Sequence, residues 1–358
     1  MVSDSRDAHE SGLLWHHRRV FPSTPQDGNP DPWGPELSRE IARAGPGRSS
    51  SGFYAGAPAP DSVLGERRSG HPEDFEEPEE IEVVPVRREL SVAIAGFAAL
   101  LGAGLILGAQ TSSPDARTPY AIVIFGVQLL FVLAWTMAMR PPAAATVAGV
   151  CVVAGLIADY AAVTSEAANL LPLLYVVLVA FALALGGEAI RPADRMRVRD
   201  SLGTTILLVF GVVAFASLIV LTRKPIGTQA IMVCLAAAGL SLVVARLTDA
   251  LFAKPRIAPQ VPRGATGIVL GAMFGTFAAA GLGSVLVLPF TPAKGAILGL
   301  VAASLAGLVD LAVNYGETGR EMAGQAPTFW LARHMQGPLG AFALAAPVAY
   351  ALAVFFLS

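Results

Sequence analysis

Nine apolar runs of about 20 residues fill most of the chain from Ser91 to its C-terminus. About 20 helical residues are needed to cross a bilayer core about 30 Å thick. Strands are excluded because the runs are continuous and do not alternate between apolar and polar residues. The expected fold class is therefore all-α, a polytopic membrane bundle of about nine helices. The predicted spans are 91–110, 119–139, 142–160, 170–189, 202–222, 229–247, 266–289, 295–313 and 337–357.

The N-terminal segment 1–85 has a different composition from the rest of the chain. It is rich in Pro, Gly and Ser, and it holds 16 of the 27 acidic residues but only eight of the 25 basic ones. Such a segment cannot bury enough apolar surface to offset the entropy of ordering it. We therefore expect a disordered acidic tail at 1–85 and a membrane domain at 86–358. The tail is either a solvated spacer or a docking arm for a basic protein partner.

The placement of Lys and Arg predicts the orientation. If the tail is cytoplasmic, thirteen bases of the membrane domain fall in inner loops and four in outer loops. The four outer bases are Arg117, Arg223, Lys224 and Lys294. This asymmetry predicts a plasma-membrane protein with a cytoplasmic N-terminus and its C-terminus outside.

Small residues recur at four-residue spacing in the seventh and eighth spans. The pairs are Gly271 with Gly275, Gly295 with Gly299, and Ala303 with Gly307. Such spacing lets helix backbones approach closely. It predicts tight packing within one bundle, with a homodimer as the alternative. The two cysteines, Cys151 and Cys234, lie in apolar runs and are expected to be buried free thiols.

Polar side chains at the inner ends of the spans are the candidates for function. Three pairs stand there: Asp310 with Asn314, Arg246 with Asp249, and Glu188 with Arg191. The last two pairs are three residues apart, so each could form an ion pair on one helix face. A carboxylate at this depth is costly and usually faces the bundle interior with a partner. The pairs predict either a cytoplasm-facing polar cavity or ion pairs that only fix helix depth.

Three stretches of the membrane domain resemble the phosphatidate cytidylyltransferase (CDP-diacylglycerol synthase) family. They are Arg197–Thr204, the loop Phe252–Pro262 with Lys254 and Arg256, and a C-terminal series of Gly307–Leu311, His334 and Ala346–Tyr350. The resemblance implies a membrane enzyme that joins CTP to phosphatidate, with Mg²⁺ held by aspartates at the inner face. It makes Asp310 the metal ligand and leaves Asp310 and His334 as remnants of the catalytic set. The substrate-binding candidates are Arg246, Asp249 and Asn314 at the inner ends of the spans, together with Lys254, Arg256 and Thr266 in or next to the resembling loop.

Most of the family's other functional residues are missing. The family has Lys-Lys-Ser/Thr-Trp-Glu where this chain has Gly264-Ala-Thr-Gly-Ile268, so that only Thr266 fits. An aspartate of the family falls on Leu242, and its final Asp-Arg-x-Asp falls near Leu339–Ala343, which has no ionisable residue. We therefore expect a diverged relative that is catalytically inactive.

Three functions follow as hypotheses. The first is a non-catalytic protein that binds a lipid or a protein partner at the cytoplasmic face. The second is an active cytidylyltransferase that uses Mg²⁺, and the third is a transporter or lipid flippase, whose helices are often discontinuous at matching places. We expect membrane lipids as partners, and no nucleic acid.

Overall fold

The computed structural model describes residues 85–112, 116–190, 195–252, 254–325 and 329–357, without the side chains of 187–201. Every described residue belongs to one compact unit. Residues 1–84 of the predicted tail lie outside the described residues, and so do Arg191 and the side chain of Glu188, which were predicted to pair.

The described residues form nine α-helices and no β-strand. The helices are α2 (Arg88–Gln110), α3 (Thr118–Met139), α4 (Ala144–Thr164), α5 (Leu171–Ile190), α6 (Arg195–Thr222), α7 (Gly227–Leu251), α8 (Ala265–Val285), α9 (Pro292–Met322) and α10 (Trp330–Phe356). Each helix overlaps one predicted span. Eight are long and apolar enough to cross a membrane, and α5 is apolar over Leu171–Gly186. The predicted all-α membrane bundle is confirmed.

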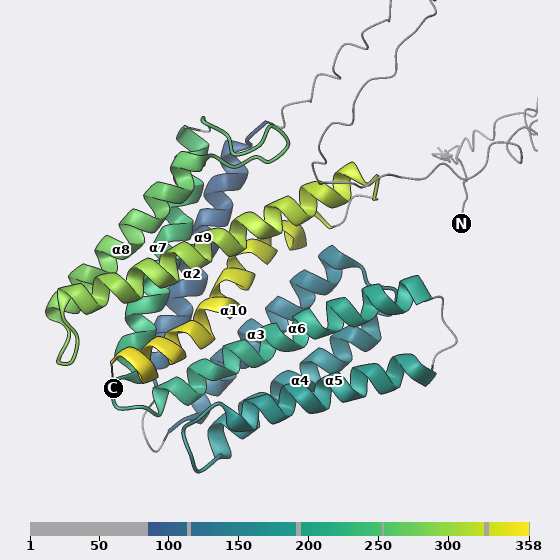
Figure 1. Ribbon diagram of the computed structural model, residues 1–358, viewed down its shortest axis with the longest axis horizontal. Helices are drawn as coiled ribbons and strands as arrows, with labels where there is room; N and C mark the ends of the chain where they lie inside the picture. The colour runs from purple at the N-terminus through teal and green to yellow at the C-terminus, as the bar shows by residue number, and fades with distance from the viewer. Residues whose placement is uncertain (1–84, 113–115, 191–194, 253, 326–328, 358) are drawn as a thin grey trace, which may run out of the picture. The chain divides into compact units, whose positions relative to one another are not determined.

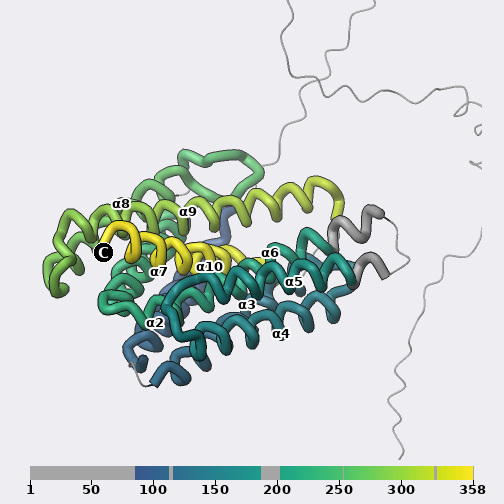
Figure 2. Tube along the Cα trace, turned by 60° about the horizontal axis from the view of Figure 1, so that its bottom comes forward, coloured from purple at the N-terminus to yellow at the C-terminus, as the bar shows by residue number. Residues whose placement is uncertain are grey.

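The helices pack in two groups joined by the last one. In the first group, α7 packs against α2, α8 and α9, and α8 packs against α9; in the second, α6 packs against α3, α4 and α5, and α4 packs against α3 and α5. Helix α10 contacts members of both groups, and Figures 1 and 2 both place it between them. We call the end of the bundle where α2, α4, α6, α8 and α10 begin the proximal end, and the opposite end the distal end.

Glycines allow close approach among α7, α8 and α9. A Cβ added at Gly275 would lie 2.5 Å from the backbone oxygen of Ala237 and 2.7 Å from the Cβ of Ala303. One added at Gly299 would lie 2.3 Å from the Cβ of Ala279. The predicted small-residue packing within the bundle is confirmed. Cys151 and Cys234 are buried free thiols, as predicted.

Helices α9 and α10 extend beyond the predicted spans at the proximal end. The predicted span 295–313 lies inside a helix of 31 residues that continues to Met322, and α10 begins at Trp330, seven residues before the predicted span. At about 1.5 Å per residue, α9 is roughly 46 Å long, which exceeds the apolar thickness of a bilayer. The polar extensions of α9 and α10 hold several of the charged side chains described below.

Two arginines cap α4 at the distal end. Arg223 donates from Nη1 to the Ala162 carbonyl at 3.1 Å and from Nη2 to the Ser165 carbonyl at 2.5 Å. Arg117 donates from Nη1 to the Val163 carbonyl at 2.9 Å. The last carbonyls of a helix have no intrahelical partner and carry partial negative charge, so cationic donors stabilise them.

Replacing Arg223 with alanine should lower the free energy of unfolding by about 1.5–3 kcal/mol, since hydrogen bonds from a charged donor contribute on this scale. Thermal unfolding of the detergent-purified protein measures the change. Lys224→Ala is the matched control, because no side-chain bond of Lys224 is seen within the described residues. Equal effects of the two substitutions would contradict a capping role for Arg223.

Candidate functional site

Asp310 of α9 lies at the centre of a buried charged cluster near the proximal end. Its side chain is fully buried. Arg246 of α7 donates from Nη2 to Asp310 Oδ1 at 2.5 Å. Arg263, in the loop between α7 and α8, brings Nη2 to 2.8 Å from Oδ2, an ion pair whose angle falls short of a hydrogen bond. Each carboxylate oxygen of Asp310 therefore faces its own guanidinium group.

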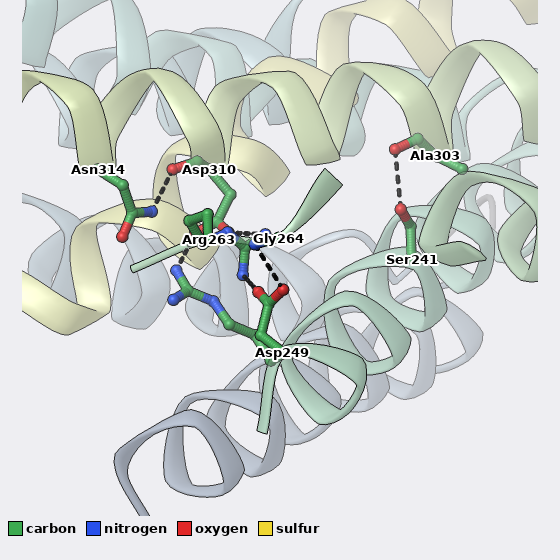
Figure 3. Close-up of polar contacts among 8 residues, drawn as sticks. Ser241, Asp249, Arg263, Gly264, Ala303, Asp310 and Asn314 are labelled. Carbon is green, nitrogen blue, oxygen red and sulfur yellow. Dashed lines mark hydrogen bonds and ion pairs between the residues drawn. The ribbon is translucent and has the colours of Figure 1, made fainter. Parts of the chain in front are cut away.

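Asp249 of α7 completes this cluster. Arg263 donates from Nη1 to Asp249 Oδ2 at 2.7 Å, and the backbone N–H of Gly264 donates to Oδ1 at 2.9 Å. Figure 3 shows Arg263 reaching toward both aspartates from the loop before α8. We call Arg246, Asp249, Arg263 and Asp310 the arginine–aspartate network.

Two glycines make room for the two carboxylates. A Cβ added at Gly337 of α10 would lie 2.1 Å from Asp310 Oδ1. A Cβ added at Gly267 of α8 would lie 2.6 Å from Asp249 Oδ1. Each aspartate thus packs directly against the backbone of a neighbouring helix. The network joins four helices, because α7, α8, α9 and α10 all contribute to its walls.

The formal charges of the network cancel. Two guanidinium groups and two carboxylates are buried together, and removal of such charges from water is costly unless each is paired. Burial lowers the pKa of Arg263, and the charge of Arg246 acts in the same direction, whereas Asp310 and Asp249 raise it. Arginine stays protonated in proteins, so Arg263 remains a cation that both aspartates stabilise.

A cavity of about 280 Å³ lies beside the network at the proximal end, and we call it the proximal cavity. Its walls come from the start of α2, the loop before α8, the end of α9 and the start of α10. Arg246 is the member of the network that lines the cavity, and it is nine-tenths buried. Asn314 and His334 also line it. The Asn314 amide donates to the backbone carbonyl of Asp310 at 2.5 Å.

A second group of charges lies on another wall of the cavity. Arg333 of α10 donates from Nε to Glu317 Oε1 at 3.0 Å, and its Nη2 contacts Glu321 Oε1. Glu317 and Glu321 are one turn apart on α9, so both face the same side of that helix. Glu317 is buried, whereas about half of Glu321 is exposed. The cavity wall thus presents two carboxylates bridged by one guanidinium.

The sequence candidates divide into three sets in the structure. Arg246, Asp249 and Asp310 meet in the network, and Arg246, Asn314 and His334 line the cavity. Lys254, Arg256 and Thr266 are not among the lining residues. Lys254 is exposed, and Arg256 turns back on its own loop to the Pro259 carbonyl at 3.5 Å.

The predicted ion pair between Arg246 and Asp249 is replaced by contacts with other elements. Arg246 pairs with α9, and Asp249 pairs with the loop before α8. Asp310 of α9 and Arg263 of the loop before α8 provide these partners, so the two side chains do not pair with each other along α7. The interpretation of Asp310 as a paired, inward-facing carboxylate agrees with its two arginine partners.

Sequence reasoning missed several charged side chains of this region. Arg263 is fully buried although it lies in a predicted loop. The one feature of the sequence that sets it apart is its place as a single arginine between Pro262 and Gly264. Glu317 and Arg333 lay beyond the predicted ends of α9 and α10. A separate polar pair was also missed: Gln128 of α3 donates to Asp159 Oδ1 of α4 at 2.8 Å, with both side chains buried.

The network does not fit the Mg²⁺ ion that the cytidylyltransferase resemblance implies. Mg²⁺ in such sites is held by one or two carboxylates together with substrate phosphates. Here both oxygens of Asp310 face arginines, and both oxygens of Asp249 accept from Arg263 and Gly264. A cation between them would also face two guanidinium groups. Among the described residues, no group of three or more His, Cys, Asp or Glu side chains is placed to hold a metal.

Comparisons with known proteins identify no relative of this chain. No protein-family model, no curated protein and no solved structure matches the chain.

Proposed function

We propose that this chain is a non-catalytic plasma-membrane protein that binds a phospholipid headgroup in the proximal cavity, at the cytoplasmic face. It is a diverged relative of the phosphatidate cytidylyltransferases that has kept an inner-face cavity without their metal chemistry. The excess of Lys and Arg in loops at the proximal end supports the orientation. The N-terminal tail then lies in the cytoplasm.

The main support for the proposal is that both aspartates form ion pairs with arginines and that the cavity lies directly beside them. A carboxylate that must bind Mg²⁺ needs free oxygens, whereas these oxygens already stabilise buried cations. The network therefore supports a structural role, in which it fixes α7, α9 and α10 around the cavity. The cavity has polar groups from Arg246, Asn314 and His334, and apolar ones from Leu90, Ile94 and Trp330. A phospholipid presents the same combination of polar head and apolar chains.

Filling the cavity should remove bound lipid. Thr318 lines the cavity and, within the described residues, donates only to the Asn314 carbonyl of its own helix, at 3.0 Å. We expect Thr318→Phe to reduce the phospholipid retained through detergent purification at least about fivefold, as measured by native mass spectrometry. A bulky ring at that position occupies the space of a headgroup, and a loss of about 1 kcal/mol in binding already corresponds to fivefold.

Thr164→Phe is the matched control. Thr164 makes the same bond to the carbonyl four residues back, at 2.7 Å, but lies at the distal end of α4. This variant should retain as much lipid as the unmodified protein. Equal lipid retention by both variants would contradict the cavity as the binding site. Formation of CDP-diacylglycerol from phosphatidate, CTP and Mg²⁺ by the purified protein would contradict the absence of catalysis.

A further inference from the structure

We infer that Asp159 of α4 binds one proton at neutral pH and, as a neutral acid, donates it from Oδ2 to Gln128 Oε1 of α3. The site lies within the group formed by α3, α4, α5 and α6, whereas none of these helices lines the proximal cavity. The inference is therefore independent of the proposed lipid binding. It follows from two buried oxygens that lack a donor and from the charges of the side chains around them.

Asp159 and Gln128 meet inside the bundle. Gln128 donates from Nε2 to Asp159 Oδ1 at 2.8 Å and to the Val212 carbonyl of α6 at 2.9 Å. Because a backbone carbonyl can only accept, the contact with Val212 fixes which end of the amide is the nitrogen. Asp159 is 6% exposed and Gln128 is 1% exposed. These two bonds join α3, α4 and α6 at one point.

This pair of side chains has more acceptors than donors. Asp159 Oδ2 and Gln128 Oε1 are both buried, and neither has a hydrogen-bond partner within the described residues. Gln128 Oε1 lies against the backbone of α4, since a Cβ added at Gly155 would lie 2.8 Å from it. Gly155 is one turn before Asp159, so the amide oxygen lies on the side of α4 that carries the carboxyl group. One hydrogen on Oδ2, shared with Oε1, would satisfy both oxygens.

The helices around the pair supply no described charge to balance a carboxylate. Helix α4 packs against α3, α5 and α6. Apart from Asp159, the described ionisable side chains of these four helices are Cys151 and Tyr160 of α4, Tyr120 of α3 and Tyr175 of α5. Thiols and phenols are neutral at neutral pH. An ionised Asp159 would therefore be an uncompensated charge.

The two arginines at the distal end of α4 bind other groups. Arg117 and Arg223 donate to backbone carbonyls of residues 162–166, beyond Asp159 in the chain. Side chains of a helix tilt toward its N-terminus, so the Asp159 side chain points away from that end. Within the described residues, neither arginine is within ion-pair distance of Asp159.

A proton fits the two open oxygens better than a metal cation does. A carboxylate without a partner is costly inside a membrane, and such a group usually becomes neutral. Ca²⁺ and Mg²⁺ take six or more oxygen ligands, whereas two protein oxygens are open here. A proton needs one oxygen to carry it and one to accept it, and the pair provides one of each.

Infrared spectroscopy of the full-length, detergent-purified protein at neutral pH tests the inference, because a protonated carboxyl group absorbs at a higher frequency than an ionised one. We expect an acid carbonyl band that Asp159→Asn removes. Asparagine has the shape of the neutral acid and its amide can still donate to Gln128 Oε1, so the unfolding temperature should stay nearly unchanged. Gln128→Met should keep the band but raise its frequency, since the acid loses its hydrogen bonds to the amide.

Glu166→Gln is the matched control, because Glu166 is an exposed carboxylate in the loop after α4. It should leave the acid band unchanged. A spectrum of the unmodified protein without an acid band, or a band that Asp159→Asn does not reduce, would overturn the inference. A marked rise in the unfolding temperature of Asp159→Asn would also overturn it, because it would show that the substitution removes a buried anion. Loss of the band on addition of Na⁺ would assign the two oxygens to a metal cation instead.

Discussion

Replacing Asp310 with asparagine should lower the free energy of unfolding by about 3–5 kcal/mol, the range found when one partner of a buried ion pair is removed. The substitution keeps the size of the side chain but removes its charge. Arg246 and Arg263 would then share one remaining carboxylate, Asp249. Thermal or chemical unfolding of the detergent-purified protein measures the loss.

Asp159→Asn is the matched control for that substitution. Asp159 is also a buried aspartate in a helix, but it accepts a hydrogen bond from the neutral amide of Gln128, and an asparagine oxygen can still accept that bond. We expect a change of about 1 kcal/mol or less there, the scale of a neutral hydrogen bond. The double variant Arg246→Met/Asp310→Leu removes one charge of each sign, and it should be more stable than Asp310→Asn. Equal effects of Asp310→Asn and Asp159→Asn would show that the arginines do not depend on Asp310.

Substitution of Gly337 with alanine should destabilise the protein by about 3 kcal/mol or more. The added methyl group would lie 2.1 Å from Asp310 Oδ1 and 3.2 Å from its Cγ, so α10 must move away or the carboxylate must leave Arg246. Overpacking of a core costs about 1–3 kcal/mol, and a weakened buried ion pair adds to that cost. The unfolding temperature and the yield of monodisperse protein in size-exclusion chromatography measure the effect.

Gly104→Ala controls for the change in helix propensity. Gly104 lies within α2, and apart from the backbone of its own helix no described atom lies within 4 Å of the position where its Cβ would be. Alanine is favoured over glycine inside a helix by about 1 kcal/mol, so this variant should be neutral or slightly more stable. A Gly337→Ala variant as stable as Gly104→Ala would contradict the close approach of α10 to the network.

The helices were predictable because the insertion of a segment into a membrane depends on the composition of that segment alone. Continuous apolar runs must close their backbone hydrogen bonds within each segment, so run length alone locates a span. The ends were less predictable where a helix continues into polar sequence. Residues 314–322 of α9 and 330–336 of α10 are helical without being part of an apolar run, and they carry Glu317 and Arg333. Their positions depend on contacts between α9 and α10, which the sequence pattern does not contain.

The candidate site was predictable only in part. A carboxylate such as Asp310 near the end of a span signals a buried partner, but the identity of that partner depends on which elements are neighbours in space. Local spacing suggested Arg246 with Asp249, whereas the packing of α7 on α9 gives Arg246 to Asp310 instead. Arg263 was assigned to a polar loop because nothing in a single sequence shows that this loop folds back over the bundle end. The family resemblance, the tail partner and a homodimer stay predictions.

The most direct measurement is an experimental density map of the full-length protein in a phospholipid nanodisc. We predict headgroup density in the proximal cavity beside Arg246, with Asp310 bridged by Arg246 and Arg263. A metal ion between Asp249 and Asp310, with both arginines turned away, would contradict the non-catalytic role. A cavity without lipid density in a well-ordered map would contradict lipid binding there.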